Sequence, residues 1–356
     1  MRAVAASIRV RRFEHEDDSK IHALLARTLP GYAGRERWSW MHKNNPLGFH
    51  GPEGDIWVAE SGDGRLVGYY GRIRYSMRCF GTTVTASQGL NLATDPQFRK
   101  QGIATQLLAS SFEDARRNGL SLTFGFPNRL SYRLAIRRGG CDLGEAGELH
   151  LVLDSERYLR SRQGGPVHRT LRRAGLALLG TSPRRRPVKR TTGQFHLSQG
   201  FAEDAGSVWV SIRDSFDLGL ERTREYLEWR YDARWGDYRA ISLAKGGQTC
   251  GYVVTGTGTK TDSKFTRIYE LLASDDEPST YEALIDTAVE AARKDSSAYL
   301  TISASGSEAS LLSLKRAGFR RVRWGARYVV NPYEDDLRQR MPRAKAYQSL
   351  GDRDYL

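Results

Sequence analysis

The segment from Arg99 to Thr105 (RKQGIAT) has the residue types of an anion-binding loop that opens a helix. It follows a predicted strand that ends at Thr94 and a turn that contains Pro96. The first N–H groups of a helix have no partner within the helix, and the helix dipole favours negative charge beside them. Gly102 lets a phosphate approach the backbone, and two basic residues open the segment. These properties predict a pyrophosphate-binding loop.

Other phosphate-binding loops have different patterns. The chain has no Gly-x-x-x-x-Gly-Lys-Ser/Thr run, and no Gly-x-Gly-x-x-Gly that is followed by an acidic residue at the nucleotide-binding distance. Six residues alone also fit an ordinary strand–turn–helix with a capping glycine. The surrounding elements therefore have to decide between the two readings.

Strands and helices are predicted to alternate around this loop. Period-2 alternation and hairpin signals predict strands, and apolar residues spaced by three and four predict helices. The strands are expected at 7–12, 56–60, 66–74, 82–94 and 121–126, and the helices at 15–28, 35–43, 103–117 and 130–138. Thr94 and Ile103 then bracket the loop between a strand and a helix.

The second half repeats this plan in the same order. The matching pairs are 195–204 with 8–17, 243–254 with 58–70, 281–294 with 103–117, and 299–303 with 122–126. Preserved order over so long a stretch indicates a duplicated domain. We expect a first domain at 1–153, a basic linker at 154–192, a second, degenerate domain at 193–331 and a C-terminal tail at 332–356.

Residues Arg99–Ala104 resemble the Arg/Gln-x-x-Gly-x-Gly/Ala signature of the GNAT acyl-CoA N-acyltransferase superfamily. Three other segments resemble GNAT features: Leu92–Pro96 before the signature, Phe126–Asn128 after the next strand, and Trp40–Pro46 on the acceptor side. The resemblance covers about residues 7–150. It implies an α+β (α/β) fold with two GNAT-like domains, each a mixed, mostly antiparallel sheet flanked by helices.

By this resemblance, acetyl-CoA or another acyl-CoA is the acyl donor. The strand before the loop would pair with the pantetheine arm, the loop would hold the pyrophosphate, and an asparagine would fix the arm near the thioester. The residues expected to bind the donor are Leu92, Ala93, Thr94, Arg99, Lys100, Gln101, Gly102, Ile103, Ala104, Thr105 and Asn128.

Catalytic residues are less clearly marked. Acylation of an amine needs a base, and the departing thiolate can use an acid. Tyr132 is the candidate acid, one helical turn from the position where the family usually has tyrosine. Glu36, Glu60 and His42 are the candidate bases, and the C-terminal tail with Asp352 offers further carboxylates.

Aromatic residues gather on the expected acceptor side. They suit either a substrate face or the packing of two domains. We expect Tyr32 and Trp38 to line a substrate pocket, and Trp40 to serve packing. In the second copy, acidic residues of the segment 274–279 (SDDEPS) replace the basic loop and would repel pyrophosphate. We therefore expect no CoA binding there.

Composition restricts the remaining classes. The formal net charge is +14, and a basic run lies in 157–190 without aromatic residues suited to base stacking, so binding to nucleic acid is not expected. No apolar run is long enough to span a bilayer, and no signal peptide is evident. The three cysteines are far apart, which predicts a reducing cytoplasm, and no metal-ligand spacing occurs.

The leading functional hypothesis is a cytoplasmic N-acyltransferase that moves an acetyl or other short acyl group from acyl-CoA to a primary amine of a small molecule, such as an amino sugar or natural product, by direct attack. Transfer to a protein or peptide amine is one alternative. A non-catalytic acyl-CoA-binding regulator is another alternative. The sequence is compatible with an oligomer and does not determine the oligomeric state.

Overall fold

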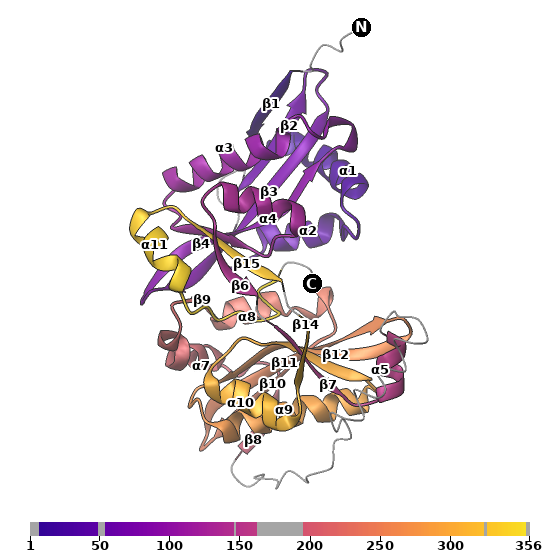
Figure 1. Cartoon of the computed structure of the whole chain (residues 1–356), viewed down its shortest axis with the longest axis vertical. Helices are drawn as coiled ribbons and strands as arrows, with labels where there is room; N and C mark the ends of the chain where they lie inside the picture. The colour runs from indigo at the N-terminus through magenta and orange to yellow at the C-terminus, as the bar shows by residue number, and fades with distance from the viewer. Residues whose placement is uncertain (1–6, 49–53, 146, 162–194, 324–325, 354–356) are drawn as a thin grey trace. The chain divides into compact units, whose positions relative to one another are not determined.

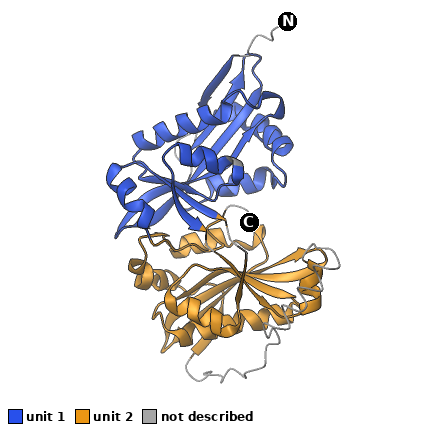
Figure 2. Ribbon diagram, viewed as in Figure 1, with its two compact units in different colours: residues 1–144, 327–344 blue, residues 145–326, 345–356 orange. Residues whose placement is uncertain are grey.

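The computed structural model describes residues 7–48, 54–145, 147–161, 195–323 and 326–353. The chain divides into two compact units (Figure 2). Unit 1 comprises Met1–Gly144 and Arg327–Ala344, and unit 2 comprises Glu145–Ala326 and Lys345–Leu356. Each unit holds one mixed sheet with helices packed on it (Figure 1).

The sheet of unit 1 has the strand order β1-β2-β3-β4-β5-β15-β6. Neighbours β1 to β4 are antiparallel, whereas β4 and β5 are parallel. The strands are β1 (Ile8–Arg12), β2 (Ile56–Ser61), β3 (Leu66–Cys79), β4 (Thr82–Thr94), β5 (Leu122–Gly125), β6 (Cys141–Glu145) and β15 (Arg327–Pro332). The helices are α1 (Asp18–Thr28), α2 (Gly34–Lys43), α3 (Ile103–Arg117), α4 (Arg129–Arg137) and α11 (Asp335–Arg340).

Both faces of this sheet are buried, because successive side chains of a strand point to opposite faces. In β2, Ile56 and Val58 join the cluster that contains the apolar side of α1, whereas Trp57 and Ala59 join the cluster that contains α3. Strands covered on both faces read as nearly continuous apolar runs, as β2 does.

Gly68 of β3 determines how closely α3 approaches the sheet. A Cβ atom there would lie 2.7 Å from Ile103 Cγ2 and 3.0 Å from Leu107 Cδ1. The absence of a side chain therefore lets the first two turns of α3 pack directly on β3. This contact positions the start of α3, where the predicted loop ends.

Unit 2 repeats the architecture. Its sheet has the order β14-β7-β13-β12-β11-β10-β8, with β12 and β13 parallel. The strands are β7 (Glu148–Val152), β8 (Phe195–Gln199), β10 (Tyr238–Lys245), β11 (Gln248–Lys260), β12 (Ser263–Ala273), β13 (Tyr299–Ser303) and β14 (Arg320–Arg323), with a short β9 (Leu218–Leu220) outside this order. The helices are α5 (Ser155–Ser161), α7 (Ala205–Ile212), α8 (Arg224–Arg230), α9 (Pro278–Lys294) and α10 (Glu308–Ala317).

The two halves of the chain exchange one strand each. β15 comes from the second half but lies between β5 and β6 in unit 1, and β7 comes from the first half but lies between β13 and β14 in unit 2. The compact units therefore differ from the expected divisions at 153 and 331. The expected tail 332–356 is also divided: residues up to Ala344 belong to unit 1, and those from Lys345 onward belong to unit 2.

The predicted elements of the first half are confirmed. β4 and α3 have the predicted bounds, and the others differ by a few residues at their ends, except that β3 continues to Cys79. Residues 162–192 of the expected basic linker and the carboxylates beyond Arg353 lie outside the described residues.

Candidate functional site

The loop between β4 and α3 has an exposed helix start that is open to an anion. Gly102 is the N-cap of α3 with φ of +79°, a left-handed conformation that favours glycine, and no side chain caps the helix. The first turn carries no acidic residue, while Arg99 and Lys100 are exposed beside it. A Cβ atom on Gly102 would have only Gln106 Nε2 within 4 Å, at 3.9 Å. Space and unpaired N–H groups thus coincide at this point.

The strand that leads into the loop separates from its parallel neighbour. β4 pairs with β5 at Ala86, Ser87 and Gln88 only, so that no register with β5 covers the stretch from Gly89 to Thr94 within the described chain. At the end of β5, a Cβ atom on Gly125 would have no atom within 4 Å. The two strands therefore splay apart where an extended ligand could pair with the backbone of β4.

A β-bulge marks the middle of this stretch. The register of β3 with β4 shifts between the pairs Tyr69–Ala93 and Gly71–Leu90, and Asn91 has φ of +53°. A bulge turns the backbone and leaves the extra residue outside the ladder, which is a common device beside active sites. Here it lies within the splayed stretch, before the loop.

Comparison with known proteins bears on this geometry. Residues 9–142 match the family model described as "Acetyltransferase (GNAT) domain". The chain contains a GNAT acetyltransferase domain. No curated protein matches the sequence.

Solved structures extend the similarity to the whole fold. A GCN5-related N-acetyltransferase from Anabaena variabilis is similar with a TM-score of 0.64 and 12% identity, over 92% of this chain and 73% of that chain. A probable N-acyltransferase from Enterococcus faecalis has a TM-score of 0.62 and 12% identity, over 93% and 74% of the two chains. The N-myristoyltransferase of Saccharomyces cerevisiae, solved with bound myristoyl-CoA, has a TM-score of 0.60 and 12% identity, over 93% and 83%. The fold is thus that of tandem GNAT-like proteins.

Asn128 of the GNAT domain has a structural contact that the sequence did not reveal. Its side-chain oxygen accepts a hydrogen bond from the Ser131 N–H at 3.1 Å, so Asn128 caps α4. Its backbone oxygen accepts a further bond from the Tyr132 N–H at 2.8 Å. The residue lies at the exposed end of the splay, and a contact with the donor stays a prediction.

Tyr132, the candidate acid, donates its hydroxyl proton to Asp142 Oδ2 of β6 at 2.8 Å. This hydrogen bond raises the pKa of Tyr132. Arg327 lies 5.2 Å from the ring centroid and pairs with Asp142 as well. The proton of Tyr132 is therefore held by a carboxylate, and its role as acid stays untested.

The candidate bases occupy different environments. Glu36 is exposed in the first turn of α2. Glu60 accepts a hydrogen bond from Arg11 Nε at 2.9 Å, and Arg11 also pairs with Asp17. Glu60 is thus already engaged by Arg11, and the structure gives it no preference as the base.

The side chain of Trp38 lies in the core of unit 1. Trp38 is 2% exposed and donates its indole N–H to the Tyr69 hydroxyl at 2.8 Å in the core, so the expectation that it lines a pocket is corrected. Tyr69 also contacts His42 Nε2 at 3.3 Å. His42 is buried. Burial lowers its pKa to about 3, so the ring is neutral at ordinary pH. Tyr32 is half-buried against His22, and burial raises its pKa to about 12.

In unit 2 the loop before α9 is already satisfied by its own side chains. Asp275 accepts hydrogen bonds from the Glu277 N–H at 3.1 Å and from Thr280 Oγ1 at 2.8 Å. Pro278 at the helix start has no N–H to donate. The acidic residues and the missing donors both oppose phosphate binding at this helix.

The chain's own C-terminal segment lies along the splay of unit 2. β12 pairs with β13 only at Thr266 and Arg267, which reproduces the short register of β4 with β5. Beyond that point the Gly351 N–H bonds to Tyr269 O of β12 at 3.3 Å, and Arg353 bonds to Ser303 Oγ of β13 at 3.4 Å. The segment thus occupies the position that is open in unit 1.

A buried charge cluster holds this segment in place. Arg222 is fully buried and contacts Glu270 at 3.3 Å and Asp352 at 2.8 Å. Ser349 Oγ donates to Glu270 at 2.7 Å. Burial raises the pKa of Glu270, and Arg222 opposes that rise. Sequence reasoning treated Asp352 as part of a tail, because its ion-pair partner Arg222 lies 130 residues away and leaves no local pattern.

No cluster of His, Cys, Asp and Glu side chains suited to a metal ion occurs among the described residues. No helix in the described part of the chain has the length and apolar character needed to cross a bilayer.

Proposed function

We propose that the chain transfers an acetyl or other short acyl group from acyl-CoA to a primary amine of a small molecule, and that unit 1 alone binds the donor. The observation that carries this proposal is the sequence of three features along β4: the splay from β5, the bulge at Asn91 and the uncapped start of α3 at Gly102. The bulge lies at the thioester, the splayed stretch from the bulge to Thr94 lies along the pantetheine arm, and the helix start lies at the pyrophosphate, which is the order of these parts in an acyl-CoA.

The proposed roles follow from the backbone. N–H groups of Ile103, Ala104 and Thr105 bind the pyrophosphate with Arg99 and Lys100, since charge-assisted hydrogen bonds to a helix start favour an anion. A backbone N–H of the stretch Leu92–Thr94 polarises the thioester carbonyl and stabilises the oxyanion that forms when the amine attacks. The bond from the amine nitrogen to the carbonyl carbon forms, the carbon–sulfur bond breaks, and CoA leaves as the thiol after protonation.

Unit 2 offers no second donor site. Its loop is acidic and its splay is filled by residues up to Arg353, so neither half of an acyl-CoA has a place there. The acceptor alternatives are a small amine and a protein or peptide amine.

The first test is calorimetric titration of the full chain with acetyl-CoA and with CoA. Gly102→Asp places a carboxylate at the helix start and should weaken binding by more than tenfold, because a like charge replaces the space for a phosphate. Gly102→Asn is the matched control, since asparagine has the same shape and the same tolerance of positive φ without the charge. Asp276→Lys in unit 2 should leave donor binding unchanged.

Loss of donor binding in both Gly102 variants alike would assign the effect to bulk rather than charge. Unchanged binding in Gly102→Asp would show that the loop does not hold the donor. If acetyl-CoA fails to bind the wild type, titration with myristoyl-CoA tests a longer acyl group, as carried by the yeast N-myristoyltransferase structure. Release of CoA thiol in the presence of amino sugars then tests the acceptor class.

A further inference from the structure

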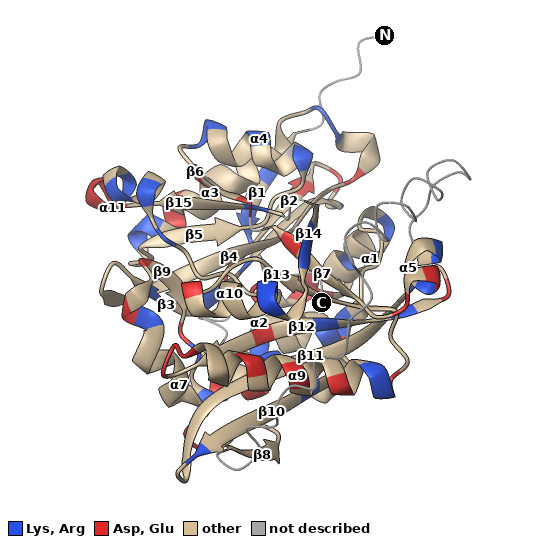
Figure 3. Cartoon of the chain, turned by 60° about the horizontal axis from the view of Figure 1, so that its bottom comes forward, with Lys and Arg blue, Asp and Glu red and all other residues tan. Residues whose placement is uncertain are grey.

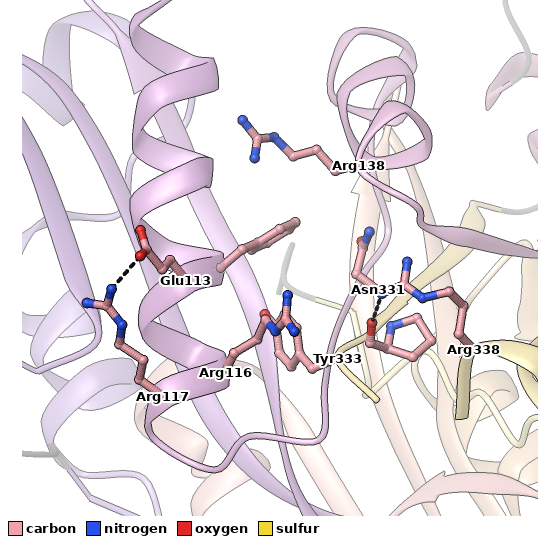
Figure 4. A pocket seen from close by; sticks show the side chains of 9 residues that line it. Glu113, Arg116, Arg117, Arg138, Asn331, Tyr333 and Arg338 are labelled. Atoms are coloured by element: carbon pink, nitrogen blue, oxygen red, sulfur yellow. Dashed lines mark hydrogen bonds and ion pairs between the residues drawn. The ribbon is translucent and has the colours of Figure 1, made fainter. Parts of the chain in front are cut away.

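A cavity in unit 1 lies along the later turns of α3. Its volume is about 420 Å³, and its walls come from α3, the end of α4, β15 and α11. Figure 4 shows its side chains, among them four arginines: Arg116, Arg117, Arg138 and Arg338. Glu113 is the one carboxylate among the residues that line it.

Two hydrogen bonds hold two of these arginines in place around the cavity. Arg138 donates to the Thr105 backbone oxygen at 2.5 Å. Arg338 donates to the Pro332 backbone oxygen at 2.9 Å, a bond drawn in Figure 4. Gly139 makes room for Arg338, because a Cβ atom there would lie 2.5 Å from Arg338 Nη1. The guanidinium groups are thus anchored through backbone oxygens, which leave their charge uncompensated.

The charge of the cavity is not neutralised within the described part of the chain. Glu113 forms an ion pair with Arg117, so these two residues together add no net charge to the cavity. Arg116 has no hydrogen bond or ion pair among the described residues. Asp335 lies 3.9 Å from Arg338 Nε but its side chain is 96% exposed, so it screens that charge weakly. Burial lowers the pKa of Arg138, which shows that its surroundings disfavour the unpaired charge.

The remaining walls accept an organic group. The ring of Phe112 packs edge-on against Tyr333 with centroids 6.0 Å apart, and Arg138 lies 5.8 Å from the Phe112 centroid. A cavity of about 10–15 Å³ already holds one water molecule. The volume of about 420 Å³ is therefore far larger than a single small anion needs. A charged group with an attached organic part fits this combination.

The cavity reaches from Arg138, which contacts Thr105 in the first turn of α3, to positions farther along the helix, away from the proposed donor loop. Phe112 follows Gly102 by ten positions on α3, which places it about 15 Å farther along the helix axis, and Arg116 lies about 21 Å along it. The N–H groups at the helix start therefore cannot bind an anion that is held by Arg116.

We propose that this cavity is a second anion site, which binds a small organic molecule carrying two or more phosphoryl groups. Arg116, Arg138 and Arg338 bind the phosphoryl oxygens, because the planar guanidinium group matches the geometry of phosphate. Phe112 packs against the organic part. Binding at this site does not require the pyrophosphate loop at Gly102.

Inorganic pyrophosphate is the probe for the charged part. Calorimetric titration of the full chain should show binding that survives in Gly102→Asp, in which the donor loop is blocked. Arg116→Ala and Arg338→Ala should each weaken that binding by about tenfold or more, since a charge-assisted hydrogen bond contributes about 1.5–3 kcal/mol. Arg224→Ala, an exposed arginine of α8 paired with Glu228, is the control for the same change in net charge.

Two results would overturn the proposal. Pyrophosphate binding that disappears in Gly102→Asp and persists in Arg116→Ala would place the anion at the donor loop alone. Weakening of acetyl-CoA binding by Arg116→Ala and Arg338→Ala to the same extent as pyrophosphate binding would make the cavity part of the donor site. Pyrophosphate binding at the arginines without any binding of acetyl-CoA would instead refute the proposed function and leave this site standing.

Discussion

Gly68→Ala tests whether the close contact of α3 with β3 is needed for donor binding. The added methyl group would lie 2.7 Å from Ile103 Cγ2 and 3.0 Å from both Ala59 Cβ and Leu107 Cδ1, and all three residues are buried. Overpacking of this kind costs about 1–3 kcal/mol. The reduced freedom of alanine in the unfolded chain returns about 0.4–1 kcal/mol. We expect a net loss of about 1–2 kcal/mol in the stability of unit 1.

Thermal unfolding measures this loss as a lower midpoint, by about 2–4 °C for each kcal/mol in a unit of this size. Relief of the clash moves the first turn of α3 away from the sheet, and with it the N–H groups proposed to hold the pyrophosphate. Loss of one such charge-assisted hydrogen bond should weaken the binding of acetyl-CoA by about tenfold, as measured by calorimetry.

Gly251→Ala is the matched control in unit 2. Its Cβ atom would lie 2.7 Å from Leu272 O and 2.9 Å from Leu284 Cδ1 of α9, so a comparable clash is created under the corresponding helix. Stability should fall by a similar amount while donor affinity stays at the wild-type value. The reasoning would be refuted if both substitutions weakened the binding of acetyl-CoA equally. It would also be refuted if the Gly68→Ala protein were as stable as the wild type.

Three further substitutions test other parts of the molecule. The pKa of His42 is about 3 in the folded state, below its ordinary value, so the unfolded state binds more protons and stability falls as the pH drops from about 6.5 toward 3. Urea unfolding should show a loss of up to about 1.4 kcal/mol per pH unit in this window that is absent in His42→Gln. Arg222→Ala leaves two carboxylates buried without a cation and should cost about 3–5 kcal/mol, whereas exposed Arg224→Ala should change the unfolding midpoint little; similar effects of the two would contradict the cluster. Tyr132→Phe should lower kcat by about a hundredfold with the KM for acetyl-CoA unchanged if Tyr132 is the acid, and a lowered unfolding midpoint with unchanged kcat would assign it to holding β6.

The distribution of charge also differs between the two units. Figure 3 marks Lys and Arg on α4, which carries no acidic residue, and Asp and Glu on α9. The loops before the equivalent helices α3 and α9 carry opposite charge, since Arg99 and Lys100 precede α3 whereas Asp275, Asp276 and Glu277 precede α9.

Local patterns in the sequence determined the elements and the loop. β4 and α3 were predicted with their observed bounds, because period-2 alternation and i, i+3, i+4 spacing are read within a few residues. The positive φ at Gly102 also has a local cause, since the loop must turn sharply into the helix. The duplication was visible because each copy repeats the same order of such local signals.

The tertiary structure alone decided which segments become neighbours. An alternating segment such as β7 or β15 specifies a strand and its buried face, but it does not specify the partner strand, so their exchange between the sheets left no sequence signal. The burial of Trp38, the binding of the segment up to Arg353 along β12 and the arginines around the cavity have the same origin. Each depends on contacts between residues far apart in the chain, and those contacts are set by how the sheets and helices pack.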